Sequence, residues 1–248
     1  MIAFPKRILA PVILAGAVVF VLTACAPPHH PGGSSSHHPG HSASATPTPT
    51  PAATRPAIGD LILSTSGLGP LHLGSPVPTT PAPLALMVWN PTACVSADLG
   101  ISAGDPNAGA WHTTFPDADG PAGTREPFIL TTVGSAQTGN VNLVWVWSDG
   151  PHTAAGIHVG STLEQLHSAY PDFARTVTGG VSDVYVIDGP TGSLSFEVSR
   201  QSTDGGTDYW PADQVNKVLW MGAEVSDSPY IGPIAASDGG PSGCPSGA

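Results

Sequence analysis

Two short stretches of the sequence repeat the same order of residue types. The first is Leu71-His72-Leu73-Gly74-Ser75 and the second is Ile157-His158-Val159-Gly160-Ser161. Each is followed, further along the chain, by a Val-Asn-x-Val stretch, which begins at Val141 in the first half and at Val215 in the second. Matches that recur in the same order within one chain are typical of an internal duplication. The sequence therefore predicts that the folded part of the chain is a tandem repeat.

The second copy has the clearer signals for secondary structure. A short strand is expected over residues 157–159, and Ser161 with Glu164 fits the capping box that begins a helix. The apolar residues that follow are spaced for one helical face, and Pro171 ends the helix.

Strands of an antiparallel sheet are predicted after this helix. Residues 184–187 and 194–198 flank a hairpin turn, and residues 218–221 form a further, nearly buried strand. Along the strand 194–198, apolar residues alternate with serines and Glu197. This alternation predicts a sheet with one packed face and one face in water.

The first copy departs from this pattern. Pro76 suits the first position of a helix, but Pro81 and Pro83 would break the turns that follow, so the helix of the first repeat is expected to be lost. Residues 84–126 are interpreted as a loop-rich insertion. We therefore predict a mostly β, α+β fold, built as a tandem repeat of a helix plus antiparallel strands. The predicted boundaries are 57–150 for the first repeat and 151–248 for the second.

The N-terminal segment resembles the signal of an exported bacterial lipoprotein. Lys6 and Arg7 precede an apolar run that is too short to span a membrane comfortably, which takes about 20 residues. Leu22-Thr23-Ala24-Cys25 then has the form of a lipobox, in which the cysteine thiol receives a lipid and the chain is cut just before it. Residues 1–24 are thus the expected signal peptide, and Cys25 is the expected lipidation site. An ordinary signal peptide with a chance cysteine and an uncleaved anchor are the alternatives.

A low-complexity segment follows the lipobox. Residues 26–56 contain only Pro, Gly, Ser, Thr, Ala and His, apart from Arg55. Such a composition cannot bury enough apolar surface to offset the entropy of the chain. We therefore expect a disordered Pro/Ser/His-rich tether over residues 25–56. The expected location of the protein is the extracytoplasmic face of the cell membrane.

Acidic residues dominate the charge of the chain. The sequence has 7 Lys and Arg against 18 Asp and Glu, for a formal net charge of −11. Such acidity argues against binding to nucleic acid or to anionic lipid headgroups. The expected partners are the membrane, through the lipid on Cys25, and a protein of the cell envelope.

Two cysteines remain once Cys25 is lipidated. Cys94 and Cys244 are expected to form a disulfide, because a leftover pair outside the cytoplasm is usually oxidised. The bond would close a loop of roughly 150 residues, worth on the order of 5 kcal/mol if the effect is that of chain entropy. A reactive free thiol is the alternative, although neither cysteine lies in a Cys-x-x-Cys motif.

The second copy resembles a known type of module. A short strand, a Gly-Ser/Thr-x-x-Glu helix start and a hairpin of strands are together similar to the tandem modules of β-lactamase inhibitor protein and of BamE-type lipoproteins. The residues that carry the resemblance are Gly156, Gly160, Ser161, Leu163, Glu164 and Leu166. The chain looks closest to lipoproteins of high-GC Gram-positive bacteria that combine a lipobox with such modules. The resemblance implies a non-catalytic binding or structural module of the cell envelope, with no cofactor.

A cell-envelope hydrolase is an alternative function. Residues 100–104, Gly-Ile-Ser-Ala-Gly, match the G-x-S-x-G motif, with Ser102 in the place of the nucleophile. That motif needs a buried strand before the serine and a helix after it, whereas the turn-forming residues 105–107 follow here. We therefore predict a polar loop at Ser102 and no enzyme activity.

A metal-ion scavenger is a further alternative. Half of the ten histidines lie in the tether, where neutral imidazoles could bind Zn²⁺, Ni²⁺ or Cu²⁺. These residues are His29, His30, His37, His38 and His41. A flexible segment offers no preformed geometry, so the affinity of such a site would be modest. The acidic stretches 117–126 and 202–208 match the calcium-loop pattern only in part and are interpreted as turns.

Aromatic residues suggest one candidate contact surface. Trp145 and Trp147 are two residues apart, hence on one strand face, and their apolar neighbours favour the core. Tyr209 and Trp210 lie among Gly and Asp, which predicts an exposed loop. Because Trp and Tyr dominate binding hot spots, this pair is the predicted contact with a partner.

The lipidation of Cys25 can be tested on the native protein. Mass spectrometry of the mature N-terminus should find a peptide that begins at Cys25 and carries acyl chains on that residue. Two or more chains are expected, because a single chain holds a protein at a membrane only marginally. An unacylated Cys25 thiol would contradict the assignment.

Overall fold

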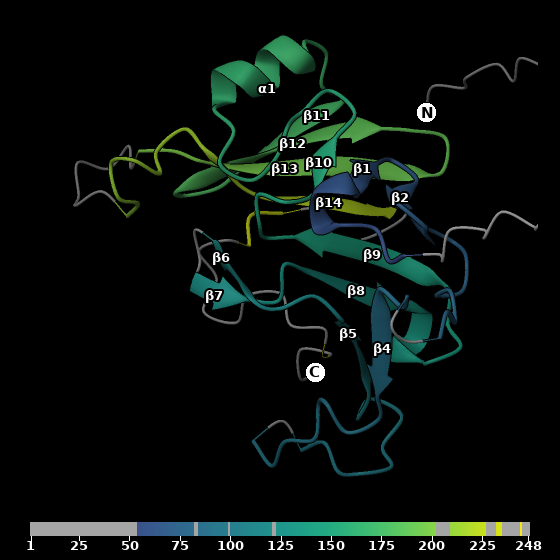
Figure 1. Cartoon of the computed structure of the whole chain (residues 1–248). Helices are drawn as coiled ribbons and strands as arrows, with labels where there is room; N and C mark the ends of the chain where they lie inside the picture. Colours follow the sequence, from purple (N-terminus) through teal and green to yellow (C-terminus); the bar gives the residue numbers. More distant parts are fainter. Residues whose placement is uncertain are drawn as a thin grey trace, which may run out of the picture. The chain divides into compact units, whose positions relative to one another are not determined.

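The fold is known from a computed structural model. It describes residues 54–81, 84–98, 100–120, 123–201, 209–226, 232–234 and Cys244, all within the compact unit Pro51–Ala248. Over these residues the fold is mostly β, with antiparallel sheets and one α-helix (Figure 1). The predicted mostly β, α+β class is therefore confirmed. Within the same residues, no helix has the length and apolar character needed to cross a membrane.

A large antiparallel sheet contains strands from both halves of the chain. Its strands, in spatial order, are β11 (Arg175–Thr178), β12 (Ser182–Asp188), β13 (Gly192–Ser199), β14 (Val218–Val225), β9 (Val141–Val146), β8 (Phe128–Thr132), β5 (Ala110–Thr113) and β4 (Met87–Asn90). The strands predicted over 184–187, 194–198 and 218–221 are confirmed, as is the hairpin between the first two. Because β9 pairs with β14, the two halves share one continuous sheet.

Shorter elements complete the unit. A four-stranded sheet has the order β10 (His152–Thr153), β1 (Ile62–Ser64), β2 (Gly67–Leu68) and β3 (Leu71–His72). Strands β6 (Ala118–Gly120) and β7 (Gly123–Arg125) form a separate hairpin. The helices are α1 (Leu163–Ala169) and the 3-10 turns η1 (Ile58–Asp60) and η2 (Val133–Ser135).

One face of the large sheet, called the first face, packs against the small sheet and α1. Phe128 and Phe196 of the large sheet cluster with Leu68 of the small sheet and Leu166 of α1, and all four have no exposed surface. The ring of Tyr170, at the end of α1, lies 5.5 Å from that of Phe196. These contacts fix α1 at the β11–β13 end of the sheet (Figure 1).

Helix α1 begins one residue later than the predicted capping box. Thr162 is the N-cap, since its hydroxyl accepts from the Gln165 amide at 3.1 Å while the Gln165 side chain accepts from the Thr162 amide at 2.7 Å. Ser161 is buried, and its carbonyl accepts from the Val218 amide at 2.8 Å. Ser161 is therefore paired with the sheet, and Glu164 forms no capping box.

The strand predicted over residues 157–159 is also wrong. Only His158 makes a bridge there, with His152. Gly156 and Gly160 have positive φ angles of 80° and 92°, so a turn lies on each side of these three residues. In the first half, residues 76–81 and 84–86 contain no helix, as their prolines predict.

Residue Arg55 belongs to the folded unit, although it was predicted to lie in the tether. Its guanidinium donates to the Thr114 carbonyl at 2.9 Å and to the Thr114 hydroxyl at 2.6 Å. It also lies 4.1 Å from the ring centre of Phe115, in cation–π contact. The folded unit therefore starts before the predicted boundary at residue 57.

Within each half of the chain, a Gly-Ser stretch is hydrogen-bonded to a valine further along that half. The four bonds, each 2.8 Å long, are Gly74 N–H to Val141 C=O, Val141 N–H to Ser75 C=O, Gly160 N–H to Val218 C=O and Val218 N–H to Ser161 C=O. Val141 and Val218 occupy corresponding positions in these bonds, whereas the sequence comparison placed Val215 opposite Val141. Val215 lies in the connection before β14.

The pair of Trp145 and Gly222 lies at the centre of the β9–β14 ladder. Val144 pairs with Ala223 on one side of it and Val146 with Met221 on the other. A β-carbon built on Gly222 would lie 2.7 Å from the Trp145 ring and 2.7 Å from the Trp220 ring. Only glycine therefore leaves room for both indoles at this position.

Adding a methyl group at this position should destabilise the sheet. We expect Gly222→Ala to lower the free energy of unfolding by about 1–3 kcal/mol, because both indoles must shift. Gly180→Ala is the matched control, since a β-carbon there meets nothing within 4 Å, and its effect should stay within about 0.5 kcal/mol. Urea denaturation measures both, and equal effects would contradict the packing argument.

Candidate functional site

The other face of the large sheet, called the second face, is polar along β13 and yet buried. Ser193, Ser195, Glu197 and Ser199 lie on this face, and each is at most 1% exposed. The prediction that these residues face water is therefore wrong.

Two segments from the C-terminal part of the chain pack on the polar residues of β13. In the connection from β13 to β14, the Gln214 carbonyl accepts a hydrogen bond from the Ser199 hydroxyl. Further along the chain, the backbone amide of Ile234 donates to the Glu197 carboxylate at 2.9 Å. On the polar side of β13, hydrogen-bonding groups of other segments thus take the place of water.

The carboxylate of Glu197 joins several elements. It accepts hydrogen bonds from the Ser182 hydroxyl of β12, the Trp220 indole of β14 and the Ile234 amide. A buried carboxylate is costly unless such donors satisfy it, and bonds to a charged acceptor are the stronger ones. Through its carboxylate, Glu197 of β13 is therefore bonded to both neighbouring strands, β12 and β14, and to residue 234.

Trp220, one of the donors to this carboxylate, belongs to a tryptophan-rich apolar cluster on the second face. Its buried members are Ile129, Leu143, Trp145, Trp147, Trp210, Leu219 and Trp220, with Ile234 packed against them. The ring of Trp220 lies 5.9 Å from that of Trp145 and 6.4 Å from that of Trp147. The prediction that Trp145 and Trp147 belong to the core is confirmed.

The predicted aromatic contact surface is half right. Tyr209 is 54% exposed, but Trp210 is only 7% exposed, so Trp210 does not form an exposed surface. The Trp210 indole donates to the Val181 carbonyl at 2.7 Å, and its ring lies 4.8 Å from that of Tyr209. Trp210 is thus held in the protein interior, and its ring packs against the exposed ring of Tyr209.

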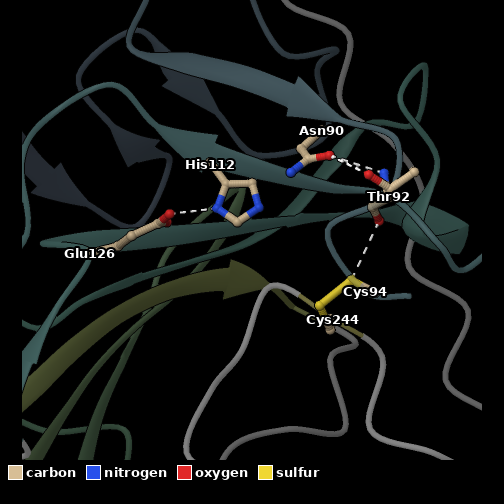
Figure 2. The surroundings of a disulfide bond; sticks show 7 residues. Asn90, Thr92, Cys94, His112, Glu126 and Cys244 are labelled. Carbon is tan, nitrogen blue, oxygen red and sulfur yellow. Dashed lines mark hydrogen bonds and ion pairs between the residues drawn. A yellow bond between two sulfur atoms is a disulfide. The ribbon is translucent and has the colours of Figure 1, made fainter. Parts of the chain in front are cut away.

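The predicted disulfide is confirmed. Cys94 and Cys244 are bonded, with their Cα atoms 5.4 Å apart (Figure 2). Cys94 follows β4 and is buried, and its sulfur lies 3.8 Å from the Gly109 carbonyl oxygen. The bond thus joins the last part of the chain to the first half of the sheet.

A histidine–carboxylate pair lies near this disulfide and was missed at the sequence level. His112 Nδ1 is 2.5 Å from Glu126 Oε1, between β5 and the approach to β8 (Figure 2). No local signal in the sequence links the two residues, because they come together only through the pairing of β5 with β8. Within the described part of the chain, no hydroxyl or thiol is hydrogen-bonded to this imidazole, so the pair does not form a nucleophile–base arrangement.

The predicted polar loop at Ser102 is confirmed. Ser102 is exposed, and its carbonyl accepts from the Asp105 amide in a turn at 3.1 Å. The strand and helix that a nucleophile elbow requires are replaced by a bridge between Ser96 and Ile101 and by turns.

The acidic stretch 117–126 forms the β6–β7 hairpin. In it the Thr124 hydroxyl donates to Asp119 at 2.6 Å. No group of three metal-ligating side chains occurs in the residues that the structure covers. The predicted signal peptide, Cys25, the five tether histidines and residues 202–208 lie outside those residues.

Two titratable groups near the β12–β13 hairpin are perturbed. The Ser193 hydroxyl donates to Asp188 at 2.7 Å and, with Arg175 at 2.9 Å, lowers the pKa of that carboxyl. Burial raises the pKa of Tyr185, whose ring lies 5.4 Å from that of His167 on α1. Both effects are typical of packing within a folded sheet.

Comparisons with known proteins gave no match. No protein-family model, no curated protein and no solved structure matches the chain. The resemblance to β-lactamase inhibitor protein and BamE-type lipoproteins therefore stays a prediction.

Replacing Glu197 tests the buried acceptor. We expect Glu197→Ala to lower the free energy of unfolding by about 3 kcal/mol, because the Trp220 and Ile234 N–H groups lose their acceptor inside the protein. Glu197→Gln should cost about 1 kcal/mol, since its amide oxygen can still accept both bonds. Urea denaturation measures the free energy of unfolding of both variants. If Glu197→Ala is as stable as Glu197→Gln, or more stable, the carboxylate does not have this role.

Proposed function

We propose that the protein is a lipid-anchored lipoprotein of the extracytoplasmic face of the cell membrane, whose folded unit binds a protein of the cell envelope without catalysis. The lipobox Leu22-Thr23-Ala24-Cys25 and the low-complexity segment after it support the anchor and the tether. A disulfide suits an oxidising compartment outside the cytoplasm, so the Cys94–Cys244 bond is consistent with this location.

We also infer that the folded unit is a tandem repeat. The equivalent hydrogen bonds at Gly74 and Gly160 support this, as does the order of the large sheet, in which four strands from each half meet at the β9–β14 pair. The register shifts of the two ladders that flank the β9–β14 pair give further support, because they occur at equivalent places. They lie between Thr131 and Thr132 in β8 and between Glu197 and Val198 in β13. The first copy is interpreted as having lost its helix.

Binding through an exposed aromatic residue is the function that the geometry supports best. The observation that carries it is Tyr209, a large side chain that is 54% exposed and backed by the buried ring of Trp210. Because the hydrogen bond from Trp210 to Val181 fixes that support, the Tyr209 ring would lose little conformational entropy on binding. Such aromatic residues are frequent centres of protein interfaces.

Substitution of Tyr209 tests the proposed contact. Capture of envelope proteins from cross-linked cells should fall at least about tenfold for Tyr209→Ala, the loss expected of an interface centre. Tyr209→Phe should retain most of the capture, because the ring stays.

Val133→Ala is the control for this experiment, since Val133 is an exposed apolar residue elsewhere, 61% exposed. Equal capture by the wild type, Tyr209→Ala and Val133→Ala would rule out the tyrosine as the contact. Failure of the wild type to capture any specific protein would count against binding itself.

A further inference from the structure

We propose that the groove between α1 and the segment before β14 binds a short zwitterionic peptide, with the carboxylate of the ligand at Lys217 and its ammonium group at Glu164. Both side chains line this one groove and are not paired with each other. The proposed site is separate from the lipid anchor and does not involve Tyr209.

The groove lies where the start of α1 meets the connection that leads into β14. It has a volume of about 460 Å³ and is lined by residues 162–164 and 167 on one side and by residues 215–217 on the other. The Leu163 amide donates to the Asn216 carbonyl at 2.9 Å, and Thr162 makes a β-bridge with Lys217. Because backbone contacts fix the two sides to each other, the groove is preformed, as small-ligand sites usually are.

Lys217 supplies the groove with an unpaired cation. In a chain with 18 acidic residues against 7 basic ones, basic side chains have many possible partners. The arginines in the described ranges each contact an acceptor or an aromatic ring, and they are Arg55, Arg125, Arg175 and Arg200. By contrast, the ammonium of Lys217 has no hydrogen bond or ion pair with any described residue, although the side chain is partly buried. A carboxylate bound there would form a charge-assisted hydrogen bond.

The opposite charge in the groove comes from Glu164 on α1. Its carboxylate forms no capping box and is not paired with any side chain in the residues that the structure covers. A ligand with a carboxylate alone would be repelled by Glu164, and a ligand with an ammonium group alone would be repelled by Lys217. A zwitterion matches both charges, so the groove favours it over either single ion.

His167 and two apolar residues favour a peptide over a free amino acid. The ring of His167 is exposed, and it lies edge-on to Phe173 and to Tyr185 at 5.4 Å from each. Its nitrogens form no hydrogen bond with the described residues, so they are available to the peptide group of a ligand. Leu163 and Val215 are partly buried in the lining and would contact small apolar side chains.

The corresponding place in the first half of the chain lacks these charged groups. Pro76 makes a bridge with Asn140 there, as Thr162 does with Lys217, so a neutral amide replaces the lysine. Residues 76–81 contain no helix and therefore offer no counterpart of Glu164 or His167. Since the same backbone bridge occurs without the charges, the fold does not require them.

NMR of the full-length protein with three related peptides tests the proposal. Lysine occurs only at positions 6 and 217, so labelling of the lysine side chains gives at most two signals, and Lys217→Met identifies the second by its loss. Alanyl-alanine should shift the Lys217 signal. It should bind about tenfold more tightly than N-acetyl-alanyl-alanine, which lacks the ammonium group, or alanyl-alaninamide, which lacks the carboxylate.

A variant of the acidic side adds a second readout. Glu164→Gln should weaken the binding of alanyl-alanine about tenfold but should not weaken that of the N-acetyl peptide. Asp213→Asn is the matched control, because it removes an exposed carboxylate that does not line the groove, and it should leave both affinities unchanged.

Three results would overturn the proposal. A Lys217 signal that none of the peptides shifts would show that the groove binds no such ligand. Equal affinity for alanyl-alanine and its N-acetyl form would show that the groove is an anion site only. Equal effects of Glu164→Gln and Asp213→Asn would show that the net charge of the protein, and not Glu164, determines binding.

Discussion

The pairing of Trp145 with Gly222 is the contact on which the rest of the fold depends. It lies at the centre of the ladder that joins the two halves of the chain into one sheet. Two indoles pack where a side chain on Gly222 would otherwise project. Because this ladder makes one wide sheet of two groups of strands, both faces of that sheet must be covered by other parts of the chain.

The two faces are covered in different ways, and this explains the unusual burial of β13. On the first face, apolar side chains of the sheet meet the small sheet and α1, which is ordinary hydrophobic packing. On the second face, polar side chains of β13 are hydrogen-bonded to the Trp220 indole of β14 and to backbone groups of Gln214 and Ile234. The cost of burying Glu197 is offset only because several donors converge on its carboxylate.

Local sequence patterns predicted several elements of the second half but not what covers them. They missed β4 and β5, two strands of the large sheet that lie in residues 84–126, which were interpreted as a loop-rich insertion. Strands 184–187 and 194–198, their hairpin and the end of α1 at Pro171 follow from periodicity and turn residues, which act over a few positions. The burial of Glu197 and Trp210 depends on residues such as Ile234 and Val181 that are distant in sequence. An alternating strand has the same pattern whether its polar face meets water or a buried network. The start of α1 was missed by one residue because Ser161 is paired with Val218, again a distant contact.

The position of Arg55 connects the fold to the proposed anchor. Arg55 packs on Phe115, which adjoins the apolar cluster of the first face, so the chain enters the folded unit on that side of the sheet. Trp210 belongs to the cluster of the second face, and it supports the exposed ring of Tyr209. Arg55, at the start of the folded unit, is therefore associated with the first face of the sheet. Tyr209, the proposed contact residue, is associated with the second face. A partner could then bind at Tyr209 without displacing the segment through which the protein would be attached to the membrane.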